Sequence, residues 1–329
     1  MADVAKLAGV SHQTVSRVIN DSTHVRPETK QRVLAAMRQL DYRPNPAARA
    51  LVTGRSGTLG VVSFDTTLHG PASTLFGIER AAHEADYFVS IVSLRSLASS
   101  SVVSAVERLR DQGVDGILVI APQESATSAL LHLPEDVPVV AAEAGPDDSV
   151  PLVAVDQFEG AQMATSHLLE LGHRTVWHIS GPVDWLEAQD RMRGWRSTLE
   201  AAGAPAPPVL HGDWSARAGH ELGRDLAANP DVTAVFVAND QMALGVLRAL
   251  HERGRVIPRE VSVVGFDDIP EAQYFTPPLT TVRQDFGEVG RSSLRMLLEL
   301  MQETGQPPQR VTIAPELVVR RSTAPPLKR

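Results

Sequence analysis

Ten short runs of apolar residues, separated by amphipathic segments, occupy residues 58–285. The first run is TLGVVSF and the last is TTVRQD; between them lie FVSIVSL, GILVIAP, PVVAAEA, LVAVD, VWHISG, VLHGDW, AVFVAND and VSVVGFDD. Near-continuous Val, Ile and Leu runs of this length are typical of parallel strands that helices cover on both faces. Ten strands are many for one sheet. The pattern therefore predicts an α/β fold with two doubly wound parallel-sheet lobes, split near Asp156.

Polar residues stand at the C-terminal ends of these runs: Asp65, Glu143, Asp156, Asp213, Asn239, Asp240, Asp267, Asp268, Gln284 and Asp285. In open α/β sheets this edge binds ligands, so two facing lobes predict one cleft. Helix capping requires the same residue types, and we expect Asp156 and Asp240 to be caps. Asn239, Asp267 and Arg191 are less typical of caps and are candidate ligand-binding residues.

Two of the side chains near these ends suit a sugar or an aromatic ligand. Trp214, in GDWSA, follows a predicted strand, and an indole face stacks on the apolar side of a pyranose or on an aromatic ring. Arg191, in AQDRMRGW, can donate a fork of hydrogen bonds to paired hydroxyls or to a carboxylate. Core packing for Trp214 and a surface ion pair for Arg191 are the alternatives.

The first twenty residues predict a helix-turn-helix. DVAKLAGVS forms a first helix that Gly9 ends in the left-handed conformation, and Ser11 caps a second helix from Gln13 to about Asn20. Apolar residues at helical spacing, Val15, Val18 and Ile19, form the inward stripe of this second helix. The outward residues are of types that read base edges or hold phosphates: His12, Gln13, Ser16, Arg17 and Asn20. The solvated face of a small helical bundle is the alternative.

Charge separates this N-terminal region from the rest of the chain. Residues 1–58 hold nine Lys and Arg against four Asp and Glu, a net charge of +5, within a chain whose total is −8. A basic head on an acidic body suggests that only the head meets an anionic polymer such as DNA. A third helix, from Pro27 to about Leu40, is expected to face the core with Val33, Leu34, Met37 and Leu40.

The segment YRPNPAARALVTGRSG predicts a short hinge helix. Asn45 can cap it, Pro46 suits its first turn and Gly54 stops it. About two turns of helix are unstable alone in water, so we expect this helix to form only when something packs against it. Leu51 is a candidate wedge into a DNA minor groove. A plain flexible linker is the alternative.

Composition and missing motifs disfavour several classes of protein. No apolar run approaches the roughly 18 residues of a membrane span, no signal peptide opens the chain and cysteine is absent, which together predict a cytoplasmic protein without disulfides. No P-loop, GxSxG or HExxH motif occurs, and the eleven histidines show no metal-ligand spacing. We therefore expect no enzymatic activity, no metal and no cofactor.

An ordered series of motifs resembles the LacI/GalR family of bacterial transcription regulators: DVAKLAGVSHQTVSRVIN, YRPN, LHGP, LLELGH, GDWSA, ANDQMALG, SVVGFDD and PPLTTVRQDF. The resemblance implies a homodimer on a near-palindromic operator. It implies a DNA-binding domain at 1–44, a hinge helix and linker at 45–57, a periplasmic-binding-protein-like core at 58–323 and a tail at 324–329. The two lobes of the core would be 58–155 with 284–312, and 156–283 with 313–323.

The same resemblance assigns roles to single residues. His12, Gln13 and Arg17 match base-reading positions, and Asn45, Ala48 and Leu51 fall in the matched hinge helix. The effector site between the lobes would use Leu68, Glu143, Arg191, Trp214, Asn239, Asp267, Gln284 and Phe286. The implied function is a repressor whose operator affinity falls when a small sugar, with a galactoside favoured, is bound. A regulator with a purine corepressor and a transport-type sugar-binding protein are the alternatives.

Overall fold

The computed structural model describes residues 1–19, 25–42, 54–94, 98–134, 136–143, 150–302 and 310–327. The chain divides into two compact units, Met1–Gly57 and Thr58–Arg329. Four predicted DNA-binding residues lie outside the described residues: Asn20, Asn45, Ala48 and Leu51. Within the described part of the chain, no helix has the length and apolar character that crossing a membrane requires.

The described residues of the first unit form three helices, α1 (Ala2–Ala8), α2 (His12–Ile19) and α3 (Pro27–Gln39). Gly9 ends α1 with a φ of 64°, and the Ser11 hydroxyl accepts a hydrogen bond from the Thr14 amide at 3.2 Å, as predicted. Val4, Val15 and Val33 are fully buried at the centre. Leu34 and Leu40 were expected in this core but are 40% and 43% exposed, because α3 turns Val33 and Ala36 toward the other helices instead.

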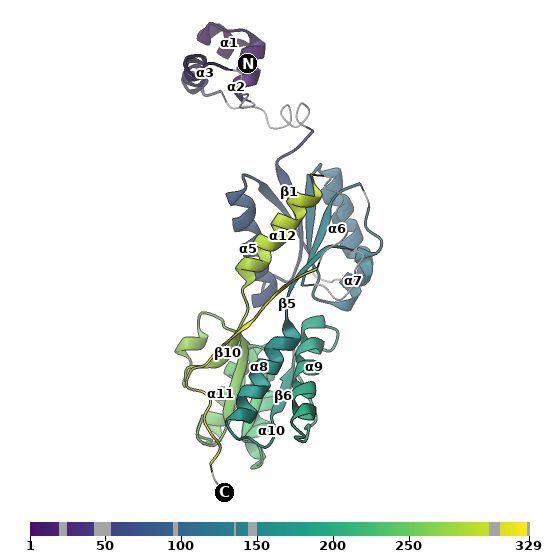
Figure 1. The fold of residues 1–329 in the computed structure, drawn as a ribbon, viewed down its shortest axis with the longest axis vertical. Coiled ribbons are helices and arrows are strands. Elements are labelled where there is room, and N and C mark those ends of the chain that lie inside the picture. Colours follow the sequence, from purple (N-terminus) through teal and green to yellow (C-terminus); the bar gives the residue numbers. More distant parts are fainter. Residues whose placement is uncertain are drawn as a thin grey trace. The chain divides into compact units, whose positions relative to one another are not determined.

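The N-lobe of the second unit contains a six-stranded parallel sheet with the order β11-β5-β4-β3-β1-β2 (Figure 1). Its strands are β1 (Thr58–Phe64), β2 (Phe88–Leu94), β3 (Gly116–Ile120), β4 (Val139–Ala142), β5 (Leu152–Val155) and β11 (Arg310–Ile313). One face packs against α5 (His69–Glu84) and α12 (Phe286–Leu300), and the other packs against α6 (Ser99–Asp111) and α7 (Glu124–Leu130).

The C-lobe has the same design, with the strand order β12-β10-β9-β8-β6-β7. Its strands are β6 (Trp177–Ser180), β7 (Leu210–His211), β8 (Ala234–Val237), β9 (Ser262–Asp267), β10 (Thr280–Arg283) and the antiparallel β12 (Glu316–Val318). One face packs against α8 (Gln157–Glu170) and α9 (Leu186–Ala201), and the other packs against α10 (Ala216–Ala228) and α11 (Asp240–Glu252). A short 3₁₀ turn, η1 (Ala272–Tyr274), precedes β10.

All ten predicted strands are present, and the fold is the expected pair of doubly wound lobes. The sequence did not predict β11 and β12. These strands have four and three residues and lie at the edges of their sheets. Their side chains are exposed or half-buried, as an edge position allows, so they form no apolar run. Because Ile313 pairs with Val155 in the N-lobe sheet, it belongs to the N-lobe and not, as expected, to the C-lobe.

The chain crosses between the lobes three times, after β5, after β10 and after β11 (Figure 1). The second crossover delivers α12 onto α5, where two glycines permit close contact of the helices. A Cβ on Gly77 would lie 2.5 Å from the Phe286 carbonyl oxygen, and one on Gly290 would lie 2.2 Å from the Gly77 carbonyl carbon. Three crossovers at one edge place the carboxyl ends of both sheets around a shared space.

Candidate functional site

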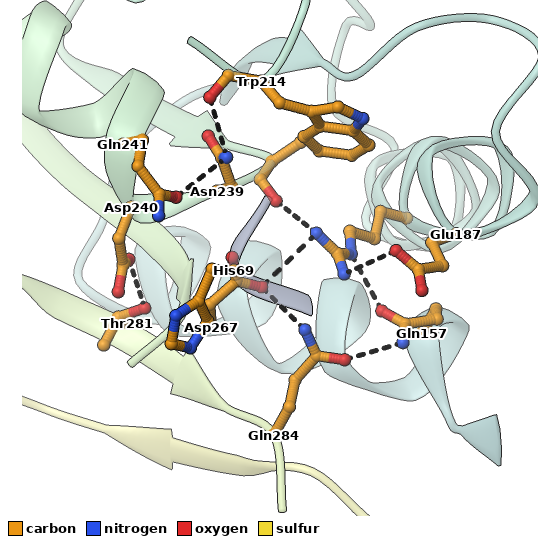
Figure 2. A network of polar contacts seen from close by, with 12 residues as sticks. His69, Gln157, Glu187, Trp214, Asn239, Asp240, Gln241, Asp267, Thr281 and Gln284 are labelled. Atoms are coloured by element: carbon orange, nitrogen blue, oxygen red, sulfur yellow. Dashed lines mark hydrogen bonds and ion pairs between the residues drawn. The ribbon is translucent and has the colours of Figure 1, made fainter. Parts of the chain in front are cut away.

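A cavity of about 290 Å³ lies between the lobes at the carboxyl ends of their strands. The N-lobe side consists of the loop after β1 and the start of α5: Thr67, Leu68, His69, Gly70 and Pro71. The C-lobe side consists of Trp185, Glu187, Arg191, Asp213, Trp214, Ser215, Ala216, Asn239, Gln241 and Asp267, and Gln284 lies on the second crossover. Figure 2 shows the polar side chains that meet here.

Arg191 is the centre of the polar network, although only 2% of it is exposed. Its Nε donates to Gln157 Oε1 at 2.8 Å, and Nη1 donates to the Ala238 carbonyl at 2.5 Å. Its guanidinium lies 3.7 Å from Glu187 and 3.8 Å from Asp267. The ring of Phe266 lies 3.9 Å below it, which adds a cation–π contact. The alternative of a surface ion pair for Arg191 is therefore wrong.

The network continues from Arg191 to two of the crossovers. Gln157, the first residue of α8, donates to Gln284 Oε1 at 2.7 Å, and Gln284 Nε2 donates to Asp267 Oδ1 at 2.6 Å (Figure 2). Gln157 follows the crossover after β5, and Gln284 lies in the crossover after β10. A ligand that exchanges hydrogen bonds with Arg191 or Asp267 therefore acts directly on the connections between the lobes.

Asn239, and not Asp240, caps α11, and Asn239 also lines the cavity. Asn239 caps α11, since its Oδ1 accepts from the Met242 amide at 2.9 Å, while its Nδ2 donates to the Trp214 carbonyl at 3.0 Å. Asp240 is fully buried and accepts from the Thr281 hydroxyl at 2.6 Å and from the Ile269 amide at 2.9 Å. The expectation that Asp240 caps the helix was wrong, because tertiary contacts with β10 take up its carboxylate. Asp156 caps α8 as expected.

Trp214 stands in the cavity wall with a left-handed backbone at φ 72°. Its indole lies on Gly181, where a Cβ would approach the ring to 2.2 Å, so only glycine fits beneath it. Trp185 meets it edge-to-face with ring centroids 5.5 Å apart. A bulky residue in the left-handed region costs roughly 1–3 kcal/mol and is typical of functional sites.

Burial shifts the titration of three carboxylates around this site. Burial, partly offset by Arg191 and reinforced by Asp267, raises the pKa of Glu187 to about 7. Burial also raises the pKa of Asp267, against the opposing charges of Arg191 and His69. Glu143, at the end of β4, has its pKa raised well above the usual range by burial first and by the nearby Glu187 second.

Six of the eight candidate effector residues line the cavity: Leu68, Arg191, Trp214, Asn239, Asp267 and Gln284. Glu143 and Phe286 are not among its lining residues. Phe286 packs edge-to-face on His69 with centroids 5.7 Å apart, so it supports the wall from behind. Glu143 is 5% exposed at a φ of 56°.

Trp185, Glu187 and His69 also line the cavity but were not predicted from the sequence. His69 lies in the LHGP motif after the first strand, which marks the expected ligand-binding edge. Glu187 precedes Arg191 by four residues on α9, a spacing that places both on one helix face, so this pairing was available from the sequence. Trp185 had no local signal beyond its position before a helix.

The exposed face of α2 is the second candidate site. His12, Gln13 and Arg17 are exposed and Ser16 is half-buried, whereas Val15 and Val18 face the core. This division presents the predicted base readers on one side of a short helix. Among the described residues of both units, no cluster of three or more His, Cys, Asp or Glu has a metal-binding arrangement.

Comparison with protein-family models identifies both units. Residues 1–45 match the model described as "Bacterial regulatory proteins, lacI family", and residues 165–323 match a "Periplasmic binding protein-like domain".

Two curated relatives resemble nearly the whole chain. The HTH-type transcriptional repressor PurR of Haemophilus influenzae is 34% identical over 97% of this chain and 97% of its own length. The lactose operon repressor of Escherichia coli K12 is 33% identical over 98% of this chain and 89% of its own length.

Solved structures give the same result. The lac repressor dimer bound to operator and the anti-inducer ONPF has a TM-score of 0.88 at 33% identity, covering 98% of each chain. A complex of the transcriptional regulator CelR with cellobiose has a TM-score of 0.73 at 33% identity, covering 97% of this chain and 98% of the other.

Proposed function

Because the chain belongs to the lacI family of bacterial regulatory proteins, and is thus a DNA-binding transcriptional repressor that responds to an effector, we propose that the effector is a small sugar, a galactoside, and that it lowers operator affinity. The protein would act as a homodimer on a near-palindromic operator. His12, Gln13 and Arg17 on α2 would contact base edges, with Ser16 nearby. Asn20 and the hinge residues Asn45, Ala48 and Leu51 remain predicted DNA contacts.

One observation supports the sugar above all: the cavity combines planar polar side chains with an aromatic wall. Arg191, Asn239 and Asp267 present a cation, an amide and a carboxylate, which together donate to and accept from vicinal hydroxyl groups. Trp214 offers an indole wall beside them for the apolar face of a pyranose. Leu68, Gln284, Phe286 and Glu143 would complete the site at its margins.

Release of DNA would follow from the position of the network. A sugar hydroxyl that bonds Arg191 or Asp267 competes with the present partners, Gln157 and Gln284, at the two crossovers. The ligand would then bind two lobe arrangements unequally, which is the condition for a population shift. A coupling of about 1–3 kcal/mol corresponds to a several-fold to hundredfold change in operator affinity.

The test is an operator-binding titration with and without a galactoside. A duplex recovered by selection from a random palindromic library serves as operator, and methyl β-galactoside serves as ligand. We expect the ligand to weaken DNA binding by at least several-fold in the native protein and not at all in Asp267→Asn, which should still bind DNA. Unchanged affinity at saturating ligand for the native protein would refute induction.

A purine corepressor is the second candidate. The edge-to-face pair Trp185 and Trp214 could equally hold a flat heteroaromatic ring, and PurR is among the relatives. Calorimetry with hypoxanthine and with methyl β-galactoside separates the two. Purine binding that tightens the operator complex would replace the sugar proposal.

A further inference from the structure

The side-chain amide of Asn239 uses both of its donors inside the protein. Its Oδ1 accepts from the Met242 amide at 2.9 Å, so Nδ2 faces the two remaining contacts. Nδ2 donates to the Trp214 carbonyl and to Gln241 Oε1, each at 3.0 Å (Figure 2). A primary amide has two N–H donors, and both are taken by these contacts. Asn239 therefore holds its neighbours in place and has no donor left for a ligand.

These contacts also fix the orientation of the Gln241 amide. A backbone N–H can only donate, so the Met242 contact identifies Oδ1 of Asn239 and leaves Nδ2 toward Gln241. Because Nδ2 cannot accept a hydrogen bond, Gln241 must present Oε1 to it, and the Gln241 nitrogen lies on the other side of the amide. Among the described residues, this nitrogen has no hydrogen-bond partner, and Figure 2 joins only the oxygen of the side chain to a neighbour. Gln241 thus carries free N–H donors in a defined orientation.

Gln241 lines the cavity as the second residue of α11, and its side chain is half-buried. A ligand that covers the Gln241 nitrogen removes it from water, and an N–H group buried without an acceptor costs free energy. The first turn of a helix also favours an electron-rich atom, because the helix dipole is positive there. The cavity therefore selects ligands that bring an acceptor oxygen to Gln241.

Resting on the proposed galactoside effector, we propose that Gln241 determines specificity by donating from Nε2 to one hydroxyl oxygen of the sugar. Asn239 is then a positioning residue, since its amide holds both the Gln241 side chain and the Trp214 backbone. Arg191 and Asp267 would bind other hydroxyl groups. A galactoside without an acceptor at the Gln241 position would leave the covered donors unpaired, and this penalty is the basis of the selection.

Isothermal titration of the full-length protein with fluorinated sugars tests this. The ligands are methyl β-galactoside and its four analogues in which fluorine replaces the hydroxyl group at position 2, 3, 4 or 6. Fluorine bound to carbon is a poor acceptor and cannot donate. We expect fluorine to weaken binding to the native protein at each hydroxyl that the cavity contacts. At the hydroxyl that Gln241 contacts, the loss should be about fivefold, the scale of one neutral hydrogen bond.

Two variants identify that hydroxyl. Gln241→Met keeps the length of the side chain but has no N–H, so it should remove the loss caused by fluorine at one position alone. Gln241→Glu keeps an acceptor for Asn239 and replaces the donor with an oxygen. It should enlarge the loss at the same position, because fluorine cannot donate to a carboxylate. Gln162→Glu, the same charge change at a half-buried glutamine of α8 that does not line the cavity, should leave all five affinities within about twofold.

A loss of affinity that is equal for all five ligands in both Gln241 variants would overturn the assignment, because a displaced Asn239 would disturb the whole site and not one hydroxyl. Losses from fluorine that neither variant changes, or that the two variants change at different positions, would overturn it as well. These results would leave the galactoside effector standing. Absence of methyl β-galactoside binding to the native protein would overturn the inference together with the proposed effector.

Discussion

The two lobes share one architecture, but they contribute different chemistry to the cavity between them. The C-lobe supplies the charged and amide groups that meet there, including Glu187, Arg191, Asn239 and Asp267. The N-lobe supplies Thr67, His69 and a mostly apolar or backbone surface formed by Leu68, Gly70 and Pro71.

This difference indicates a division of labour. Hydrogen bonds and ion pairs are directional and depend on position, so the C-lobe should determine which ligand binds. Apolar contact is non-directional, so the N-lobe can close over ligands that differ slightly in structure. Its closure then depends on whether a ligand is bound. The network from Arg191 through Gln157 to Gln284 connects the two functions.

Arg191→Ala should produce the largest loss of stability. Removing the guanidinium leaves Glu187 and Asp267 buried without their cation, and breaking a buried pair in this way typically costs about 3–5 kcal/mol. Urea denaturation measures the change. Arg193→Ala is the matched control on the same helix, because its pair with Asp190 is 63% exposed on the arginine side and should contribute less than about 1 kcal/mol. Equal losses in the two variants would contradict a special role for the C-lobe network.

Stability should fall as pH rises, owing to the acids of the C-lobe wall. The pKa of Glu187 is about 7 in the folded state and 4.5 as the ordinary value, so the folded state binds more protons than the unfolded state between these limits. The contribution is fully present below pH 4.5 and is lost as pH approaches and passes 7, by up to about 3 kcal/mol. Asp267 acts in the same direction.

Chemical denaturation of the native protein and Glu187→Gln at several pH values between 5 and 8 checks this. The glutamine variant should show a shallower fall, with its largest gain over the native protein at pH 8. Parallel curves would show that Glu187 does not titrate in this range.

Two glycine substitutions compare the lobes directly. In Gly181→Ala, the new methyl would lie 2.2 Å from the Trp214 ring, so the indole must move, at a cost of about 1–3 kcal/mol in packing. In Gly70→Ala, the nearest contact is the Phe286 ring at 3.8 Å, an ordinary distance. We expect sugar affinity, measured by calorimetry, to fall about tenfold or more in the C-lobe variant and less than about threefold in the N-lobe variant. A larger loss for Gly70→Ala would reverse the assignment of roles.

The smallest effect on binding should come from Leu68→Ala in the N-lobe. Because Leu68 is only partly buried, its truncation should weaken sugar binding by less than about twofold. Its effect on the operator response should exceed its effect on sugar affinity, because the N-lobe wall reports closure. Sugar titrations with and without operator duplex measure both quantities, and a proportional change in the two would argue against this role.

Much of the site was predictable because ligand-binding residues in this fold follow strand ends. Asn239, Asp267 and Gln284 come directly after apolar runs, and all three line the cavity. The sequence could not show which of Asn239 and Asp240 caps α11, since both residue types cap helices equally well. The choice depended on Thr281 and Ile269, which are 41 and 29 residues distant and offer hydrogen bonds to Asp240 alone.

By itself, the sequence determined the ten strands β1 to β10, the helix-turn-helix and the edge at which ligands bind, because apolar periodicity, caps and turn residues act over a few positions. Tertiary structure decided which acids share Arg191, which of two neighbours caps α11, and that Trp185 meets Trp214. It also added β11 and β12, whose exposed or half-buried side chains form no apolar run and which pair with strands far away in the sequence. The raised pKa values of Glu187 and Glu143 belong to this second group, since burial and proximity, and not residue type, cause them.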